Sequence, residues 1–139
     1  MAKMTVSGVD EFEKMLGKLD RETVKRLMKA GTDACIDEMR KITQEYGHVR
    51  TGSMMEGITA GKLVEDLGGA WQEVYPQGND SRGVSNAKKA FVINYGRGKK
   101  QTMRTGDKFI SGNKTRMEAV VNAAMRAEAD RILQEINGG

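Results

Sequence analysis

Two long stripes of apolar residues, one near each end of the chain, constrain the fold of this protein more than any other feature. Between Val24 and Tyr46, and again between Met117 and Ile136, apolar or small side chains recur at steps of three or four residues. This spacing places them on one face of an α-helix. Each helix must bury its stripe against another element, so we expect both helices to contribute to a shared core. The stripes are Val24, Met28, Gly31, Cys35, Met39, Ile42 and Tyr46, flanked by Leu27 and Ile36, and Met117, Val121, Met125, Ala129, Ile132 and Ile136.

Glycines refine the prediction for the first of these helices. Gly47 stands where a left-handed residue commonly terminates a helix, so the helix should end near Tyr46. Gly31 costs about 1 kcal/mol relative to Ala in mid-helix and permits close approach of another backbone. A shorter helical pattern at about 9–19 precedes this helix, and the last helix should cover about 113–136. We therefore expect helices over about 9–46 and at the C-terminal end.

The centre of the chain changes to the periodicity of strands. Segments 58–65 and 70–75 predict two strands of a hairpin, joined by a short turn that contains Gly68 and Gly69. Trp71 should share one strand face with Tyr75, and Val74 should lie on the other face. Pro76 should end the second strand, because it lacks a backbone N–H.

A polar loop at 77–86 follows, and the next segment is ambiguous. Asn86 can cap a short helix over 87–95, although the run Phe91-Val92-Ile93 favours a strand by propensity. We favour the helix, leading into a turn at Gly96. The whole pattern predicts one α+β domain over 1–139, with long N-terminal and C-terminal helices on a small, mainly antiparallel sheet and a mobile basic loop at 97–112.

Positive charge is concentrated in one part of the chain. The formal net charge is +4, but between Arg82 and Arg116 ten basic residues face a single acid, Asp107. Such a field attracts nucleic acid, an acidic protein or an acidic neighbouring subunit. A solvated basic loop is the simpler interpretation, because no nucleic-acid-binding motif accompanies the charge.

The residue types needed for catalysis are sparse. His48 is the single histidine and Cys35 the single cysteine, and Cys35 falls on the apolar stripe where an inert thiol is expected. The segment 96–100 lacks the spacing of a phosphate-binding loop. We therefore expect no catalytic, cofactor or metal site. One cysteine and the lack of a long apolar run are typical of a protein made in the cytosol that does not enter a membrane.

Several short segments resemble a known family. The segment 6–12 has a glycine, a hydrophobe and an acid before an aromatic residue, and 51–54 reads Thr-Gly-Ser-Met after a long helix. The segment 90–96 is an apolar run ending in an aromatic residue and glycine, with Asn94 where the family usually has an acid. The apolar pair at 109–110 introduces the C-terminal helix. The chain thus resembles the small head–tail joining, or tail-completion, proteins of tailed phages of lambdoid type.

The resemblance implies a non-enzymatic structural protein of a virion neck or tail end, assembled in the cytoplasm of the host bacterium. It implies an α+β fold and a homo-oligomeric ring, commonly hexameric, that contacts neck, adaptor or tail-tube proteins. DNA would pass along the axis of such a ring. A nucleic-acid-binding module that uses the basic segment 97–116 is the alternative function.

A closed ring needs complementary edges on each subunit. We expect the basic stretch 97–116 to form one edge, and Glu65, Asp66 and Glu73 the other. Tyr95 and Phe109 are the predicted anchors of the basic arm. For the methionines, packing under the sheet is an equal alternative to subunit contact. The other predicted contacts are Arg97, Lys99, Lys100, Met103, Arg104, Met54 and Met55.

Overall fold

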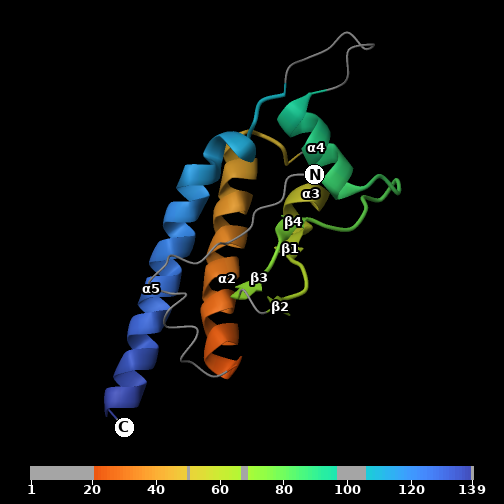
Figure 1. Ribbon diagram of the computed structural model, residues 1–139. Helices are drawn as coiled ribbons and strands as arrows, with labels where there is room; N and C mark the ends of the chain where they lie inside the picture. Colours follow the sequence, from red (N-terminus) through yellow and green to blue (C-terminus); the bar gives the residue numbers. More distant parts are fainter. Residues whose placement is uncertain (1–20, 50, 67–68, 97–105, 139) are drawn as a thin grey trace.

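The computed structural model describes residues 21–49, 51–66, 69–96 and 106–138 of the chain. Figure 1 shows a long helix pair with a hairpin and two shorter helices beside it. The α+β prediction is confirmed, and the expected helix at 9–19 lies outside the described residues. The helices are α2 (Arg21–Glu45), α3 (Ser53–Glu56), α4 (Asn86–Tyr95), the 3-10 helix η1 (Ser111–Asn113) and α5 (Lys114–Gly138), and the strands are β1 (Ile58–Ala60), β2 (Val64–Asp66), β3 (Gly69–Trp71) and β4 (Val74–Pro76).

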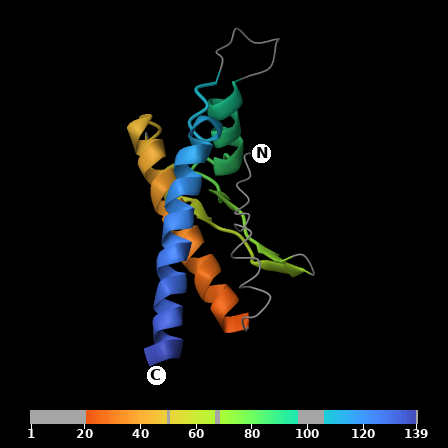
Figure 2. The same ribbon diagram turned by 60° about the vertical axis from the view of Figure 1, so that its left-hand side comes forward.

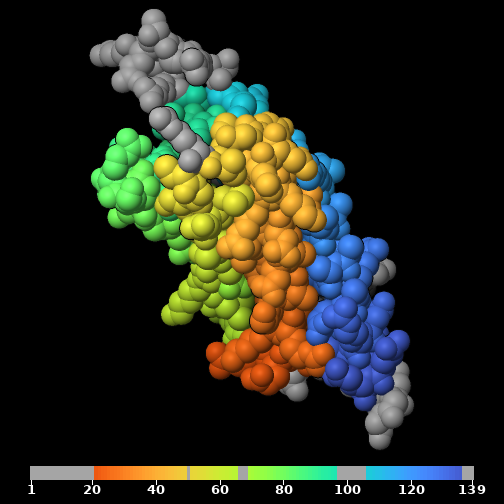
Figure 3. All heavy atoms as spheres, turned by 180° about the vertical axis from the view of Figure 1, so that it is seen from behind, coloured from red at the N-terminus to blue at the C-terminus, as the bar shows by residue number. Residues whose placement is uncertain are grey.

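Helices α2 and α5 lie side by side, as Figures 1 and 2 show from two directions. The predicted stripes meet between them, and Leu27, Cys35, Met39, Met117 and Val121 are almost completely buried. Figure 3 shows α2 between α5 and the hairpin, so its stripe and flanking residues supply the core on both sides.

The buried face of α2 lacks one residue of the predicted stripe and includes two threonines that the prediction did not name. Tyr46, which follows the last helical residue, is 41% exposed. Thr32 and Thr43 are buried instead, and each hydroxyl donates to the carbonyl oxygen four residues earlier, at 2.9 and 2.7 Å. A buried hydroxyl with a partner avoids the cost of desolvation without a hydrogen bond.

Gly31 makes room for α5, although through a side chain and not through a backbone. A Cβ atom at this position would lie 3.0 Å from Cγ and 3.1 Å from Sδ of Met125. The Met125 side chain, and not another backbone as we expected, therefore fills the space at Gly31. Gly47 has a φ of 77°, as the predicted left-handed end of α2 requires.

The hairpin contains a bulge that the sequence pattern does not predict. Strand β1 pairs with β4, with Ile58 opposite Pro76, whereas β2 pairs with β3, with Val64 opposite Trp71. Three residues, 61–63, therefore face two, 72–73, so two continuous strands become four short ones. The N–H of Gly61 donates to the Glu73 carbonyl oxygen at 2.7 Å, and Nε2 of Gln72 donates to the Gly61 carbonyl oxygen at 2.7 Å.

The bulge changes which residues of the first strand reach the core. Ile58 is fully buried and Ala60 packs against the core, but the next core residue is Leu63, three positions later. A strand without a bulge would place Lys62 there, because side chains alternate between the two faces. The extra residue thus keeps an apolar side chain on the core side.

Helix α4 forms where we favoured it, but with a different cap. The Ser85 hydroxyl accepts the N–H of Lys88 at 3.3 Å, which makes Ser85 the N-cap. Asn86 is the first helical residue, and its Nδ2 donates to the carbonyl oxygens of Gln77 at 2.9 Å and Ser53 at 3.2 Å. Asn86 therefore joins α4 to α3 and to the end of β4.

Candidate assembly surface

Helix α4 presents two aromatic rings on its outer face. Phe91 is 43% exposed and Tyr95 51% exposed, and their ring centroids are 4.9 Å apart. They are one helical turn apart, so they lie on the same face. The side of the helix that faces the core carries Ala90 and Asn94, both buried. The aromatic pair therefore lies on the exposed side of a helix whose other side is buried.

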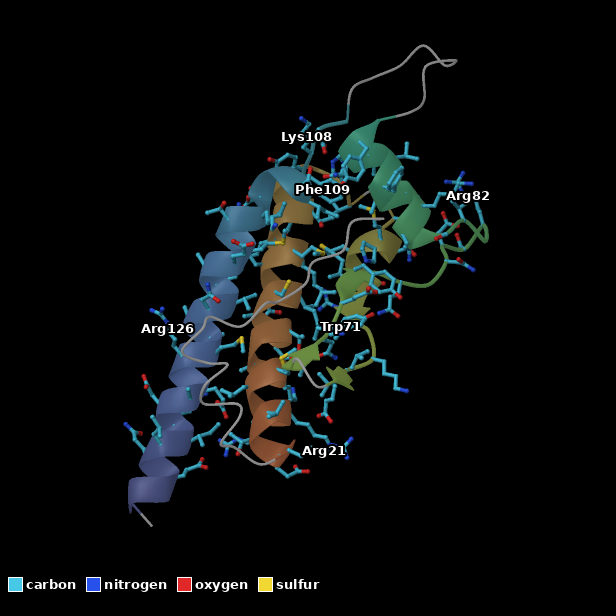
Figure 4. The ribbon with its side chains drawn as sticks, in the orientation of Figure 1. Arg21, Trp71, Arg82, Lys108, Phe109 and Arg126 are labelled. Carbon is cyan, nitrogen blue, oxygen red and sulfur yellow. The ribbon has the colours of Figure 1, made fainter. Side chains whose placement is uncertain are left out.

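Three basic residues lie on α4 and in the segments beside its two ends. Arg82 and Lys88 are exposed, Lys88 lies one turn before Phe91 on the same face, and Lys108 is exposed near the end of α4. Figure 4 shows Arg82 in the loop before α4 and Lys108 in the segment that returns beside the helix. None of these three side chains forms an ion pair with another residue in the described part of the chain.

The loop before α4 is held by a buried carboxylate. Oδ1 of Asp80 accepts the N–H of Arg82 at 2.8 Å and of Val84 at 2.9 Å, and Oδ2 pairs with the ammonium group of Lys89. The Lys89 contact, followed by the backbone hydrogen bonds, lowers the pKa of Asp80 to about 2. Asp80 is therefore ionised at neutral pH and keeps Lys89 engaged within the fold.

Asn94 joins the end of α4 to the beginning of the C-terminal helix. Its Oδ1 accepts the N–H groups of Ile110 and Ser111, each at 3.0 Å, and its Nδ2 donates to Oγ of Ser111 at 3.1 Å. The backbone N–H groups at a helix start lack intrahelical partners and need an acceptor. A carboxylate at this position would accept the same two backbone hydrogen bonds.

A second set of contacts holds the residues beside Asn94. The N–H of Asp107 donates to the Ile93 carbonyl oxygen and that of Lys108 to the Asn94 carbonyl oxygen, both at 3.0 Å. A Cβ atom on Gly106 would lie 2.2 Å from the Asn94 carbonyl oxygen, so this position requires glycine. We call Asn94 and residues 106–111 the clasp. The clasp fixes the positions of residues 96 and 106, which flank segment 97–105.

Phe109 is the apolar centre of the clasp. It is fully buried and forms a T-shaped contact with the His48 ring, with the ring centroids 4.9 Å apart, and its centroid lies 6.2 Å from that of Tyr46. Lys108, just before it, has a φ of 55°, a left-handed conformation that is unfavourable for a side chain with a Cβ atom. The Phe109 N–H donates to Oδ1 of Asp107 at 3.0 Å, which helps to stabilise this turn.

The surroundings of His48 and Cys35 indicate that both side chains contribute to the packing of the fold. Nε2 of His48 lies 2.5 Å from Oδ2 of Asp107, so the imidazole ties the end of α2 to the clasp. Burial raises the pKa of the Cys35 thiol to about 11, which leaves it protonated and a poor nucleophile at neutral pH. No group of three or more histidine, cysteine or acidic residues within the described ranges could hold a metal ion.

The predicted contacts have different positions in the structure. Tyr95 is exposed, as a contact residue must be. Met54 and Phe109 belong to the core and can only support the surface from below, while Met55 is half-buried beside Arg40, which donates to its carbonyl oxygen. Five further predicted contacts lie outside the described residues: Arg97, Lys99, Lys100, Met103 and Arg104.

Arg116 does not belong to the free basic surface, although we included it in the basic edge. Its guanidinium donates to Glu38 at 2.5 Å and to Glu45 at 2.6 and 2.8 Å, which joins α5 to α2.

Phe91 is an exposed residue of this surface that was not among the predicted contacts. Its four-residue spacing from Tyr95 and the small Ala90 beside it are the sequence signals that identify the exposed face.

Within the described ranges, no helix is both long and apolar enough to cross a lipid bilayer. No protein-family model, no curated protein and no solved structure matches the chain.

Proposed function

We propose that this protein is a structural subunit of a tailed phage or a prophage-derived particle, where it forms a ring at the neck or tail end that joins or completes the tail. The observation that supports self-assembly is the exposed pair Phe91 and Tyr95 on α4, a helix whose other side is packed against the fold. The family resemblance at 51–54, 90–96 and 109–110 supports the particular kind of assembly. The protein acts by contact, and no reaction is assigned to it.

The aromatic pair has the character of an interface centre. Clustered apolar side chains on the surface of a soluble protein favour association, because they are removed from water when a partner covers them. Aromatic residues are enriched in the buried centres of protein interfaces, and charged residues in the rim. Phe91 and Tyr95, with Lys88 on the same helix face and Arg82 and Lys108 near the two ends of α4, fit that arrangement.

The segment 97–105, which is rich in basic residues, follows α4 closely in the sequence. Its sequence offers Arg97, Lys99, Lys100 and Arg104 as contacts, with Met103 as an apolar one. The clasp fixes the two flanking positions, so contacts made by the segment are transmitted to a rigid part of the molecule. We propose that neighbouring copies, and neck, adaptor or tail-tube proteins, are the partners.

Native mass spectrometry and electron microscopy of the purified protein test this proposal. We expect closed rings, with six copies as the leading stoichiometry. The triple variant Lys99→Glu, Lys100→Glu and Arg104→Glu should fail to form rings or enter particles, while Lys25→Glu, a charge reversal at the exposed start of α2, should assemble normally. A chain that stays monomeric at high concentration and is absent from particles would contradict the proposal.

A second candidate function, nucleic-acid binding, is supported by the charge of the same region. Residues 81–106 contain seven basic residues and no acid, and Arg82, Lys88 and Lys108 lack ionic partners in the described part of the molecule. Binding of the monomer to free duplex DNA that weakens steeply with salt would favour this function, because each neutralised phosphate releases counterions. Rings without such binding favour the first proposal.

A further inference from the structure

The hairpin carries the features expected of the surface that receives α4. Trp71, at the end of β3, is 36% exposed and lies directly opposite Val64 of β2. Opposite residues of an antiparallel pair share a face, so an indole and a valine side chain lie together there. This is a second exposed aromatic site on a different element from α4.

The formal charges of the two elements are opposite. The hairpin, residues 58–76, contains the acids Glu65, Asp66 and Glu73 and one base, Lys62. The loop and helix at 77–96 contain three bases and one acid, and the pair Asp80–Lys89 leaves Arg82 and Lys88 in excess. The hairpin therefore carries a net charge of −2, and the α4 region one of +2.

Glu65 remains accessible to a cation on another molecule. Oε2 of Glu65 lies 3.2 Å from Nε of Arg21, and the side chain of Arg21 is 74% exposed. An ion pair this exposed contributes little to stability, because solvent and salt screen it. A cation such as Lys88 that arrives with an apolar contact can replace Arg21 at small cost.

The two surfaces lie on different edges of one molecule. Figure 4 shows Trp71 on the hairpin beside the middle of α2, whereas Arg82 and Lys108 lie towards the end of the molecule formed by α4. Figure 1 shows the same separation between β2–β3 and α4. Two complementary surfaces on different edges generate a head-to-tail contact, and such contacts close into a ring when the rotation between subunits allows it.

We infer that the exposed face of α4, centred on Phe91 and Tyr95, binds the Trp71 end of the hairpin of the next copy. The inference rests on the proposed ring and names the two edges that meet within it. Lys88 of one copy would then face Glu65 of the next. The occupant of the α4 face is a second copy of this chain.

Disulfide trapping between two variants tests the contact. Trp71→Cys and Tyr95→Cys are made in separate chains of different mass, mixed, and oxidised gently. The mixed disulfide should form readily, and mass spectrometry identifies it. The native Cys35 is buried and its thiol is protonated at neutral pH, so it should not contribute to crosslinking. Arg126→Cys, on the outer side of α5 in Figure 4, is the control that should not crosslink with Tyr95→Cys.

Charge exchange gives a second, independent measurement. Lys88→Glu should weaken self-association by about tenfold, because it places like charges at the contact. Adding Glu65→Lys in the same chain should restore association, since every interface then has the reversed pair. Lys88 is exposed and the side chain of Glu65 is 33% exposed, so the variants should fold, and circular dichroism verifies this.

The outcomes separate this inference from the proposed function. Rings that form without the Trp71–Tyr95 crosslink would overturn the inference and leave the ring intact. Crosslinks only between two Tyr95→Cys chains would overturn it in favour of a symmetric α4–α4 contact. A monomer that binds single-stranded or duplex DNA through Phe91 and Lys88, with no crosslink, would overturn both proposals.

Discussion

The helix pair α2–α5 and the α4 region differ in whether their charged side chains are paired and their apolar side chains buried. Between α2 and α5, Arg26 bonds to Glu128 and Glu135, and Arg116 bonds to Glu38 and Glu45. These contacts lower the pKa values of Glu45, Glu128 and Glu135, first through the hydrogen bonds to arginine. Around α4, by contrast, cations and aromatic rings face outward.

The two regions differ in what they leave on the surface. In the helix pair, Arg26 and Arg116 are paired with glutamates and most of the two apolar stripes is buried. The α4 region is equally well anchored from below, through Asn86 and Asn94, but it leaves its outer face uncovered. Rigid anchoring combined with an uncovered face is the arrangement that minimises the entropy lost on binding. The following predictions separate the anchoring from the uncovered face.

Phe109→Ala should have the largest effect, because it removes the apolar centre of the clasp. Truncation of a fully buried phenylalanine typically lowers the free energy of unfolding by about 3–5 kcal/mol. Urea unfolding followed by circular dichroism measures it. A loss below 1 kcal/mol would mean that Phe109 is not a core residue and would restore it as a contact candidate.

Asn94→Leu should lower the free energy of unfolding by about 1–3 kcal/mol, because two buried N–H groups lose their acceptor. Asn94→Asp is the matched variant, and it should retain most of the stability at pH 7 because a carboxylate accepts both hydrogen bonds at a helix start. The same urea titration compares the two. Equal losses in both variants would show that the acceptor oxygen is not what stabilises the clasp.

Lys108→Gly should raise the free energy of unfolding by about 1 kcal/mol, since glycine adopts the left-handed conformation without steric cost. Lys108→Ala keeps the Cβ atom and is the control, which should show no such gain. Thermal unfolding detects the difference as a higher melting temperature. If both variants unfold at the same temperature, the turn at residue 108 is not strained.

The Asp80–Lys89 pair should make the loop before α4 sensitive to acid. The pKa of Asp80 is about 2 in the folded chain, below its ordinary value of 3.8, so its contribution is present above pH 4. This contribution is lost as the pH falls from about 4 to about 2. Asp80→Asn should therefore flatten that part of the pH dependence in urea titrations, and an unchanged profile would rule out the ion pair as its source.

The double variant Phe91→Ser and Tyr95→Ser should change stability least and association most. Both rings are exposed, so the free energy of unfolding should change by about 0.5 kcal/mol or less. Self-association, measured by analytical ultracentrifugation, should be lost. A variant that still forms rings would separate the aromatic pair from assembly.

The extent to which the fold follows from the sequence depends on how local the signal is. The stripes of α2 and α5 and the end at Gly47 are encoded by neighbouring residues, and the prediction of these elements is confirmed. The bulge at 61–63 is not, because it depends on which residue of the opposite strand each position meets. Ser85 and Asn86 are both good caps, and the bonds from Asn86 to distant carbonyl groups decide between them.

The candidate assembly surface could also be predicted only where the signal is local in the sequence. Tyr95 can be predicted as exposed because a charged, glycine-containing segment follows it, and Phe91 follows once the helix is assigned. Met54 and Phe109 look like contact residues in a polar context, but residues distant in the chain bury them. The role of Asn94 as a helix cap for residues 110 and 111 depends on a tertiary contact that no spacing in the sequence reveals.

The clasp has a consequence for the tolerance of changes between its two sides. Since contacts within the described residues hold residues 96 and 106, we expect the core to tolerate an insertion between them. Doubling the length of such an insertion costs only about 0.6 kcal/mol in closure entropy. We therefore expect variants with a longer or differently charged segment 97–105 to unfold at nearly the same urea concentration as the native chain.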